Sequence, residues 1–248
     1  MACPLRPSCR CRDQAGRHRQ RPCAPASPFR IISFPPAHLL IIDAQNDFCI
    51  PPVLDQSGRV QTGGGALYVG GRSGTGAMDD NVRLAEFIYR NLGAITDITA
   101  TFDTHLAFQI FSPSFWVDDT GAGVTPFRTI TVDQIRRGEV APNPAMAAWL
   151  CNGHYAWLRT QVEFYCQRLE AAGKYTLYIW PFHCLLGSPG HALAGVIQEA
   201  RLFHAFARNT QSRSETKGSN PLTEHYSILG AEVLDRVDGR PLDHKLSL

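Results

Sequence analysis

Residues 38–43 read His-Leu-Leu-Ile-Ile-Asp, a short apolar run that ends in a carboxylate. Because its apolar residues do not alternate with polar ones, the run predicts a strand buried on both faces, as in a parallel sheet. A second run, Ile98 to Asp103, also ends in Asp, and a third, Tyr175 to Trp180, leads into a proline. We therefore expect three strands, with the first at the centre of the sheet.

Three segments between and after these runs carry apolar residues at helical spacing. They cover approximately residues 79–92, 154–172 and 191–208, and Asp79 or Asp80 would cap the first helix. Strands that alternate with helices predict an α/β fold with an open, doubly wound, mostly parallel sheet. Ligands of such sheets bind beyond the carboxyl ends of the strands, so the functional residues are expected there.

The composition separates the beginning of the chain from the rest. Residues 1–30 contain seven arginines and one acid, whereas the remainder is mildly acidic. We expect a disordered Arg/Pro/Cys-rich leader over residues 1–34 and one domain over residues 35–248. Organellar targeting by the leader stays open, although its prolines would interrupt an amphipathic helix.

Charge, hydropathy and cysteine spacing also exclude some classes of protein. A mildly acidic domain argues against a nucleic-acid binder, and no apolar stretch is long enough to span a bilayer. The eight cysteines include no C-x-x-C pair, and no signal peptide precedes them. We therefore expect free thiols and a reducing, cytoplasmic compartment.

The segment Asp103-Thr104-His105 is a candidate metal site. In an extended chain, residues i and i+2 point the same way, so the carboxylate and the imidazole converge. His183, three residues after Trp180, would add a third ligand from another strand end. This donor set suits zinc, iron or manganese. The alternative is a helix-capping Asp beside a surface His.

Asp43 and Lys217 are candidates for proton transfer and charge stabilisation. Asp43 ends an apolar strand, where it would lose its hydration, and this makes it a candidate general base. A structural Asp that accepts backbone hydrogen bonds is the alternative. Lys217 is one of three lysines beside 21 arginines and precedes Gly218, which permits an unusual turn. It suggests a need for a compact ammonium, with a hydrated loop lysine as the alternative.

Taken in order, these segments resemble the nicotinamidase branch of the isochorismatase-like cysteine hydrolases. The similar motifs are IIDAQNDFC (residues 41–49), GALYVGG (65–71), TFDTH (101–105), IWPFHC (179–184) and TKG (216–218). The resemblance covers roughly residues 38–232, and five motifs in the same order are more specific than any one of them.

The resemblance implies an isochorismatase-like fold and the hydrolysis of nicotinamide to nicotinate and ammonia, a step of NAD salvage, by a Cys-Asp-Lys triad. A divalent metal ion and a small aromatic amide would be bound side by side, and a homo-oligomer stays open. The residues implied are Asp43 and Lys217 for catalysis, Phe48 and Trp180 for substrate binding, and Asp103, His105 and His183 for the metal. Core packing is the alternative for the two aromatic residues.

Two departures from the family pattern affect these expectations. Ser112 stands where the family places another His ligand, which would weaken the metal site. The family's nucleophilic cysteine lies beyond the lysine, and no cysteine follows Lys217. Cys184 belongs to the motif around His183 and is not expected to replace that nucleophile.

We therefore expect a C-terminally truncated hydrolase whose sheet lacks its second half. Such a chain would leave a long apolar edge uncovered and would tend to aggregate. One alternative is a non-catalytic relative that binds a metal or an aromatic ligand, or joins an oligomer, without turnover. Another is a related hydrolase of a different substrate.

Overall fold

The computed structural model describes residues 11–12, 18–19, 36–173 and 175–242. Two short strands, β1 (Cys11–Arg12) and β2 (His18–Arg19), pair in antiparallel fashion. The other residues of the segment 1–34, for which we predicted disorder and left targeting open, lie outside the described residues. A separate compact unit begins at Pro36 and contains the candidate site.

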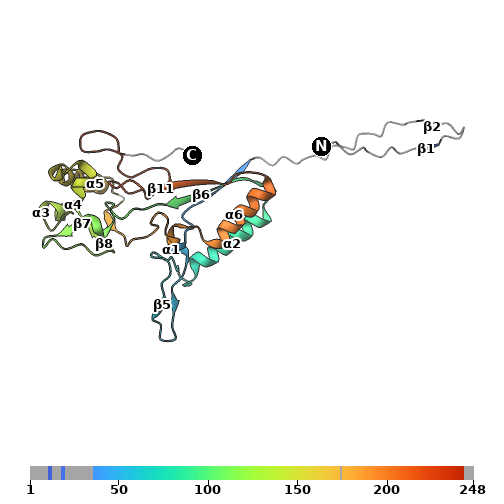
Figure 1. Ribbon diagram of the computed structural model, residues 1–248, viewed down its shortest axis with the longest axis horizontal. Helices are drawn as coiled ribbons and strands as arrows, with labels where there is room; N and C mark the ends of the chain where they lie inside the picture. Colours follow the sequence, from blue (N-terminus) through green and yellow to red (C-terminus); the bar gives the residue numbers. More distant parts are fainter. Residues whose placement is uncertain (1–10, 13–17, 20–35, 174, 243–248) are drawn as a thin grey trace. The chain divides into compact units, whose positions relative to one another are not determined.

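A three-stranded parallel sheet organises this unit (Figure 1). Its strands are β3 (Ala37–Ile41), β6 (Ile95–Asp103) and β11 (Arg213–Lys217), in the spatial order β11-β6-β3. Lys217 lies opposite Asp103 across the β11–β6 pair, so the ends of these two strands coincide. The predicted α/β class with an open parallel sheet is confirmed.

Helices α2 (Gly76–Arg90) and α6 (Gly195–Arg208) lie side by side along this sheet (Figure 1). Their buried residues form one hydrophobic cluster with alternate residues of β3 and β6: Ile41, Ala85, Ile88, Ile98, Ala100, Ile197 and Ala200. Both helices match predicted segments. However, Thr75 rather than Asp79 or Asp80 occupies the N-cap position of α2, without a capping hydrogen bond from its side chain. Helix α6 begins later than expected, after the 3-10 turn Pro189–His191.

The third strand of the sheet differs from the prediction. The run from Tyr175 to Trp180 does contain a strand, β10 (Leu177–Ile179), but it pairs antiparallel with β8 (Arg128–Ile130) outside the parallel sheet. Its place is taken by β11, whose sequence Arg-Ser-Glu-Thr-Lys has no apolar pattern. Hydrogen bonding to β6, rather than its own hydrophobicity, makes this segment a strand.

The first strand is also not central. Within the described residues, β3 pairs only with β6 and therefore forms an edge of the sheet. Leu40 and the adjacent Ile42 are 37% and 56% exposed, so the edge presents apolar side chains to solvent. The prediction of a central first strand is wrong for this structure, whereas the expected uncovered apolar edge is present.

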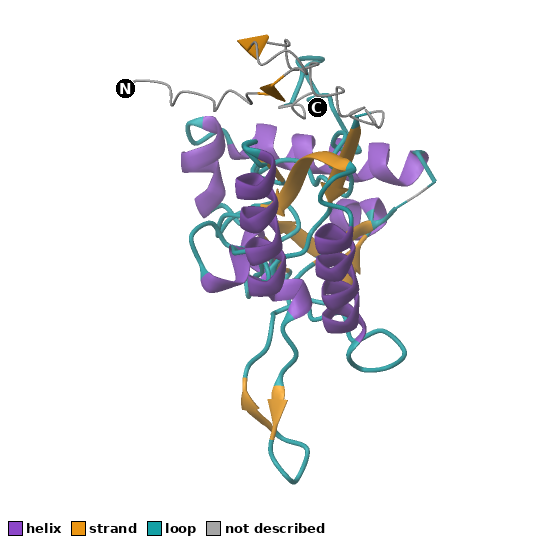
Figure 2. Ribbon diagram, turned by 90° about the vertical axis from the view of Figure 1, so that its right-hand side faces the viewer, coloured by secondary structure: helices purple, strands orange, loops and turns teal. Residues whose placement is uncertain are grey.

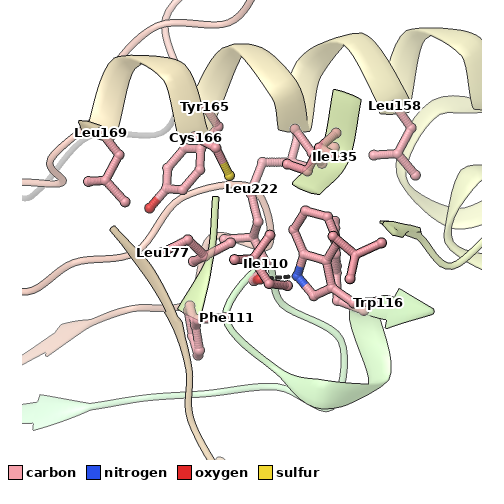
Figure 3. Packing of buried hydrophobic residues seen from close by; sticks show 14 of the residues in the cluster. Ile110, Phe111, Trp116, Ile135, Leu158, Tyr165, Cys166, Leu169, Leu177 and Leu222 are labelled. Atoms are coloured by element: carbon pink, nitrogen blue, oxygen red, sulfur yellow. Dashed lines mark hydrogen bonds between the residues drawn. The ribbon is translucent and has the colours of Figure 1, made fainter. Parts of the chain in front are cut away.

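Residues between β6 and α6 build most of a second hydrophobic core. The remaining elements there are β7 (Trp116–Asp118), α3 (Val132–Arg137), β9 (Val140–Pro142), α4 (Ala145–Cys151) and α5 (Tyr155–Ala171). Figure 3 shows Trp116, Tyr165 and Leu177 packed beneath α5, with the indole N–H of Trp116 donating to the carbonyl of Ile110. Figure 2 shows helices on more than one side of the strands. The predicted helix over residues 154–172 corresponds to α5.

The remaining short elements lie between β3 and α2 and near the site. They are α1 (Asn46–Cys49), the hairpin β4 (Val53–Leu54) and β5 (Val60–Thr62), and the 3-10 turn Pro113–Phe115. Cys49, Cys151, Cys166 and Cys184 are free thiols. None of the described helices combines the length and hydropathy needed to cross a membrane.

Candidate functional site

Three predicted residues converge at the carboxyl ends of the parallel strands. Lys217 ends β11, and its Nζ lies 3.2 Å from Oδ2 of Asp43 and 3.2 Å from Oδ1 of Asp103. The side chain of Lys217 is buried, so the alternative of a hydrated loop lysine is wrong. Burial by itself would lower the pKa of Lys217, but the carboxylates of Asp103 and Asp43 outweigh it and raise the pKa. The ammonium is therefore a fixed positive charge between two carboxylates.

Gly218 allows the chain to turn close to His105 directly after Lys217. Its φ is +83°, a left-handed conformation that side chains rarely adopt, and a Cβ there would lie 2.7 Å from Cε1 of His105. Only glycine lets the chain turn at this point with the imidazole so close. The unusual turn predicted after Lys217 is confirmed.

Asp43 lies at the rim of the site rather than in the interior. Its side chain is 30% exposed, because β3 is an edge strand; the expectation that Asp43 would be desolvated is therefore wrong. The hydroxyl of Thr101 accepts from the backbone N–H of Asp43 and donates to its Oδ1, both at 3.1 Å. Asp43 also lines a cavity of about 460 Å³ beside β3. This carboxylate is fixed by hydrogen bonds and a cation, and yet is open to an incoming molecule.

Asp103, His105 and His183 form a buried group whose ligand atoms all lie within 4.8 Å of one another. Oδ2 of Asp103 lies 3.0 Å from Nε2 of His105 and 3.5 Å from Nε2 of His183. The Nδ1 atoms face backbone carbonyls, that of His105 at Gly218 (3.2 Å) and that of His183 at Pro181 (2.8 Å). Since a carbonyl can only accept, each Nδ1 carries a proton, and in the neutral ring Nε2 keeps a lone pair.

Without a metal ion, Nε2 of a protonated ring donates to Asp103, whereas the neutral rings would present their Nε2 lone pairs to a cation. A divalent metal ion would satisfy all three groups, and the carbonyl contacts orient the rings as in metal sites. Burial by itself would raise the pKa of Asp103, but hydrogen bonds from His105 and His183 and the charge of Lys217 hold it well below its usual range. The donor set of two imidazoles and a carboxylate fits zinc, iron or manganese.

Ser112 occupies the position at which the family pattern places another His ligand. It is buried and follows Phe111, whose ring centroid lies 4.7 Å from that of His105. A hydroxyl is a weaker ligand than an imidazole, so the expectation of a weakened metal site stays a prediction.

The two predicted aromatic residues both lie close to one candidate ligand, His183. The ring centroid of His183 is 5.7 Å from that of Phe48 and 6.4 Å from that of Trp180. Phe48, in α1, also lines the cavity beside Asp43. Both aromatic side chains are half-buried and also pack against the hydrophobic cores, so packing accounts for part of each.

Glu224 lies behind Trp180 and was not predicted. The indole N–H of Trp180 donates to Oε1 of Glu224 at 3.0 Å. Burial, together with the negative charge of Asp103, raises the pKa of Glu224 to about 8, although the hydrogen bond from Trp180 opposes this. The carboxyl group therefore holds its proton to a higher pH than an exposed glutamate does, and no motif in the sequence marks it as such.

Two further residues connect the segments of the site. The side chain of Gln45 accepts from the backbone N–H of Asp103 (2.7 Å) and donates to its carbonyl (2.8 Å), which fixes the end of β6 against β3. Asp47 accepts from the backbone N–H groups of Cys184 and Ala66. Both residues belong to the motif at residues 41–49. The one sequence signal that could have indicated Gln45 is a glutamine placed shortly after an apolar strand.

Cys184 is buried next to the candidate metal group. Burial raises the pKa of its thiol far above the usual value, and the carboxylates of Asp103, Asp47 and Asp43 raise it further. Because the thiolate is the reactive form, this thiol is a poor nucleophile. The structure thus supports the expectation that Cys184 does not replace the missing cysteine.

Comparison with known proteins gives three solved structures. The yeast nicotinamidase Pnc1p bound to nicotinaldehyde is 17% identical (TM-score 0.44, 79% of this chain and 62% of that chain). Another structure of Pnc1p is 17% identical (TM-score 0.44, 84% and 66%), as is a nicotinamidase and pyrazinamidase of Acinetobacter baumanii (TM-score 0.41, 79% and 58%). This chain thus spans about 58–66% of the length of these three chains. No protein-family model and no curated protein matches the sequence. Because the sequence identities and TM-scores are low, the function is inferred from the geometry of the site alone.

Proposed function

We propose that this site binds a divalent metal ion and a small aromatic amide, nicotinamide, within a hydrolase framework of the nicotinamidase type. One observation carries the proposal: Asp103 joins a metal donor set on one side to the Lys217–Asp43 pair on the other. A carboxylate shared in this way places a proton acceptor next to a metal-binding group, as the hydrolysis of a bound amide needs.

Each residue has a distinct role in this proposal. Asp43 accepts a proton from the attacking nucleophile, and Lys217 stabilises the carboxylate before that transfer. Phe48 and Trp180 hold the flat ring of the amide beside His183. When bound, the metal ion would supply a Lewis acid for a ring nitrogen of the amide, directly or through water.

A second candidate function is binding of the same ligands without turnover. The specific observation in its favour concerns Cys184, the thiol next to the metal group: it is buried, and burial raises its pKa. A hydrolase of the proposed type needs a nucleophile, so the two candidates differ in turnover and agree in binding.

The experiment measures metal content, nicotinamide binding and ammonia release of the purified chain after loading with zinc, manganese or iron(II). We expect His183→Ala to lose the metal, whereas His154→Ala, at an exposed loop histidine, keeps it. Metal retained in both variants would overturn the metal assignment.

Ammonia release that Asp43→Asn abolishes without loss of metal would support hydrolysis. Nicotinamide binding without ammonia would support the binding candidate. If nicotinamide binds in neither the loaded nor the metal-free chain, the aromatic amide is the wrong ligand.

A further inference from the structure

A second cavity lies at the other edge of the sheet, between α6 and the start of β11. Its volume is about 760 Å³, and none of the residues proposed above for metal, amide or catalysis lines it. The polar part of its wall includes Arg201, Ser212 and Ser214, and the apolar part includes Leu202 and Phe206. No aspartate or glutamate is among the residues that line it.

Arg201 is the unusual member of this wall. The residue is only 6% exposed, and its guanidinium donates to the carbonyl of Arg213 (2.9 Å), the hydroxyl of Ser214 (3.2 Å) and the side-chain oxygen of Gln198 (3.1 Å). All three acceptors are neutral, and Nε has no hydrogen-bond partner among the described residues. Burial lowers the pKa of Arg201, and no carboxylate offsets that effect.

Burying a guanidinium without a counter-charge is unfavourable for the stability of the folded chain. Proteins normally place a carboxylate beside such a group, because transfer of an unpaired charge from water costs several kcal/mol. Here the nearby carboxylate of Asp97 instead pairs with Arg213, at 3.2 Å. An anion supplied from solution would provide the missing charge, and an arginine presents its donors in the fork that carboxylates and phosphates accept.

The rest of the wall favours an anion that carries an apolar group. Ser212 and Ser214 add hydroxyl groups near the guanidinium, while Leu202 and Phe206 are 48% and 78% exposed apolar surface at the same cavity. The volume suits a small organic molecule. We propose that this cavity binds a small organic anion, with its carboxylate or phosphate against Arg201 and its apolar part against Phe206. This site is separate from the candidate metal site and does not depend on its function.

The test uses the full chain, freed of metal, and two probes, benzoate and inorganic phosphate, with benzyl alcohol as the neutral control. Arg201 also ties α6 to β11, so its replacement would disturb the fold. The informative variant is Phe206→Glu, which places a negative charge at an exposed position of the wall. Phe203→Glu, on the same helix but outside the wall, is the matched control, and Phe206→Gln separates charge from shape.

We expect benzoate to bind the native chain and Phe203→Glu with equal affinity in calorimetry. Phe206→Glu should bind it at least about tenfold more weakly and Phe206→Gln less so, because only the former repels an anion. The same pattern with phosphate alone would identify a phosphate site, and benzoate alone a carboxylate site. Equal binding of benzyl alcohol, unchanged binding in Phe206→Glu, no binding of either anion, or loss only in His183→Ala would overturn the proposal.

Discussion

The raised pKa of Glu224, which is hydrogen-bonded to Trp180, can be tested through the pH dependence of stability. Its carboxyl group is buried, accepts the indole N–H of Trp180, and lies next to the hydroxyl of Tyr165, which accepts the backbone N–H of Glu224 at 3.2 Å. Glu224→Gln preserves the size of the side chain and the acceptor for the indole, and removes the ionisable group. The variant therefore isolates the cost of ionising Glu224 in the folded chain.

The magnitude follows from the pKa of the folded chain. Burial raises the pKa of Glu224 from 4.5 to about 8. Between these values the unfolded chain has released the proton while the folded chain still holds it, so this group's favourable contribution to stability declines as pH rises. The decline is about 1.4 kcal/mol per pH unit, which amounts to about 5 kcal/mol across the window. Below about pH 4.5 the contribution is complete, and above about pH 8 no further decline is expected.

Urea denaturation of the metal-free chain at several pH values between about 5 and 9 measures this effect. We expect the difference in unfolding free energy between Glu224→Gln and the native chain to grow with pH and to level off near pH 8. Glu163→Gln is the control, because Glu163 pairs with Arg136 on the surface of α5 at 2.8 Å. Parallel stability curves for Glu224→Gln and the native chain would refute the reasoning.

Two further predictions concern the backbone of the site and the edge of the sheet. Gly218→Ala should destabilise the fold by about 1–3 kcal/mol and weaken metal binding, because φ is +83° and the new Cβ meets His105; unchanged values in denaturation and metal titration would contradict this. Ile42→Lys should slow aggregation, measured by light scattering, because Ile42 is an exposed apolar residue beside the unpaired side of β3. The exposed Ile50 lies away from that strand, so an equal effect of Ile50→Lys would show that general charge, not the edge, is responsible.

The sequence predicted the parts of the site that depend on local signals. Asp103 and His105 share one side of a strand end, and a strand rich in apolar residues marks that end clearly. The partner histidine, His183, was predicted from its place after another apolar run, although that run belongs to a different pair of strands. Asp103, His105 and His183 lie together because the loop after β10 returns to His105, where Leu185 forms a parallel bridge.

The parts that sequence reasoning missed depend on partners that lie far away in the chain. β11 is polar and becomes a strand only through hydrogen bonds to β6, so its own residues carry no signal. The exposure of Asp43 depends on the absence of a described partner on one side of β3, and the apolar sequence of a strand does not reveal whether it is central. The raised pKa of Glu224 likewise arises from burial against Trp180 and Tyr165, which lie far from it in the sequence.

The position of Lys217 explains how a metal donor set can be buried before any metal binds. Asp103 is a deeply buried carboxylate, and such a group is strongly unfavourable unless an opposite charge accompanies it. Lys217 supplies that charge on Oδ1, which leaves Oδ2 directed at the two imidazoles. Asp43, on the other side of Lys217, balances the ammonium and is the more exposed of the two carboxylates. A ligand or proton that enters from the cavity beside β3 therefore meets Asp43 first. A change in the charge of Asp43 acts on the metal group through Lys217, the buried lysine that contacts both carboxylates.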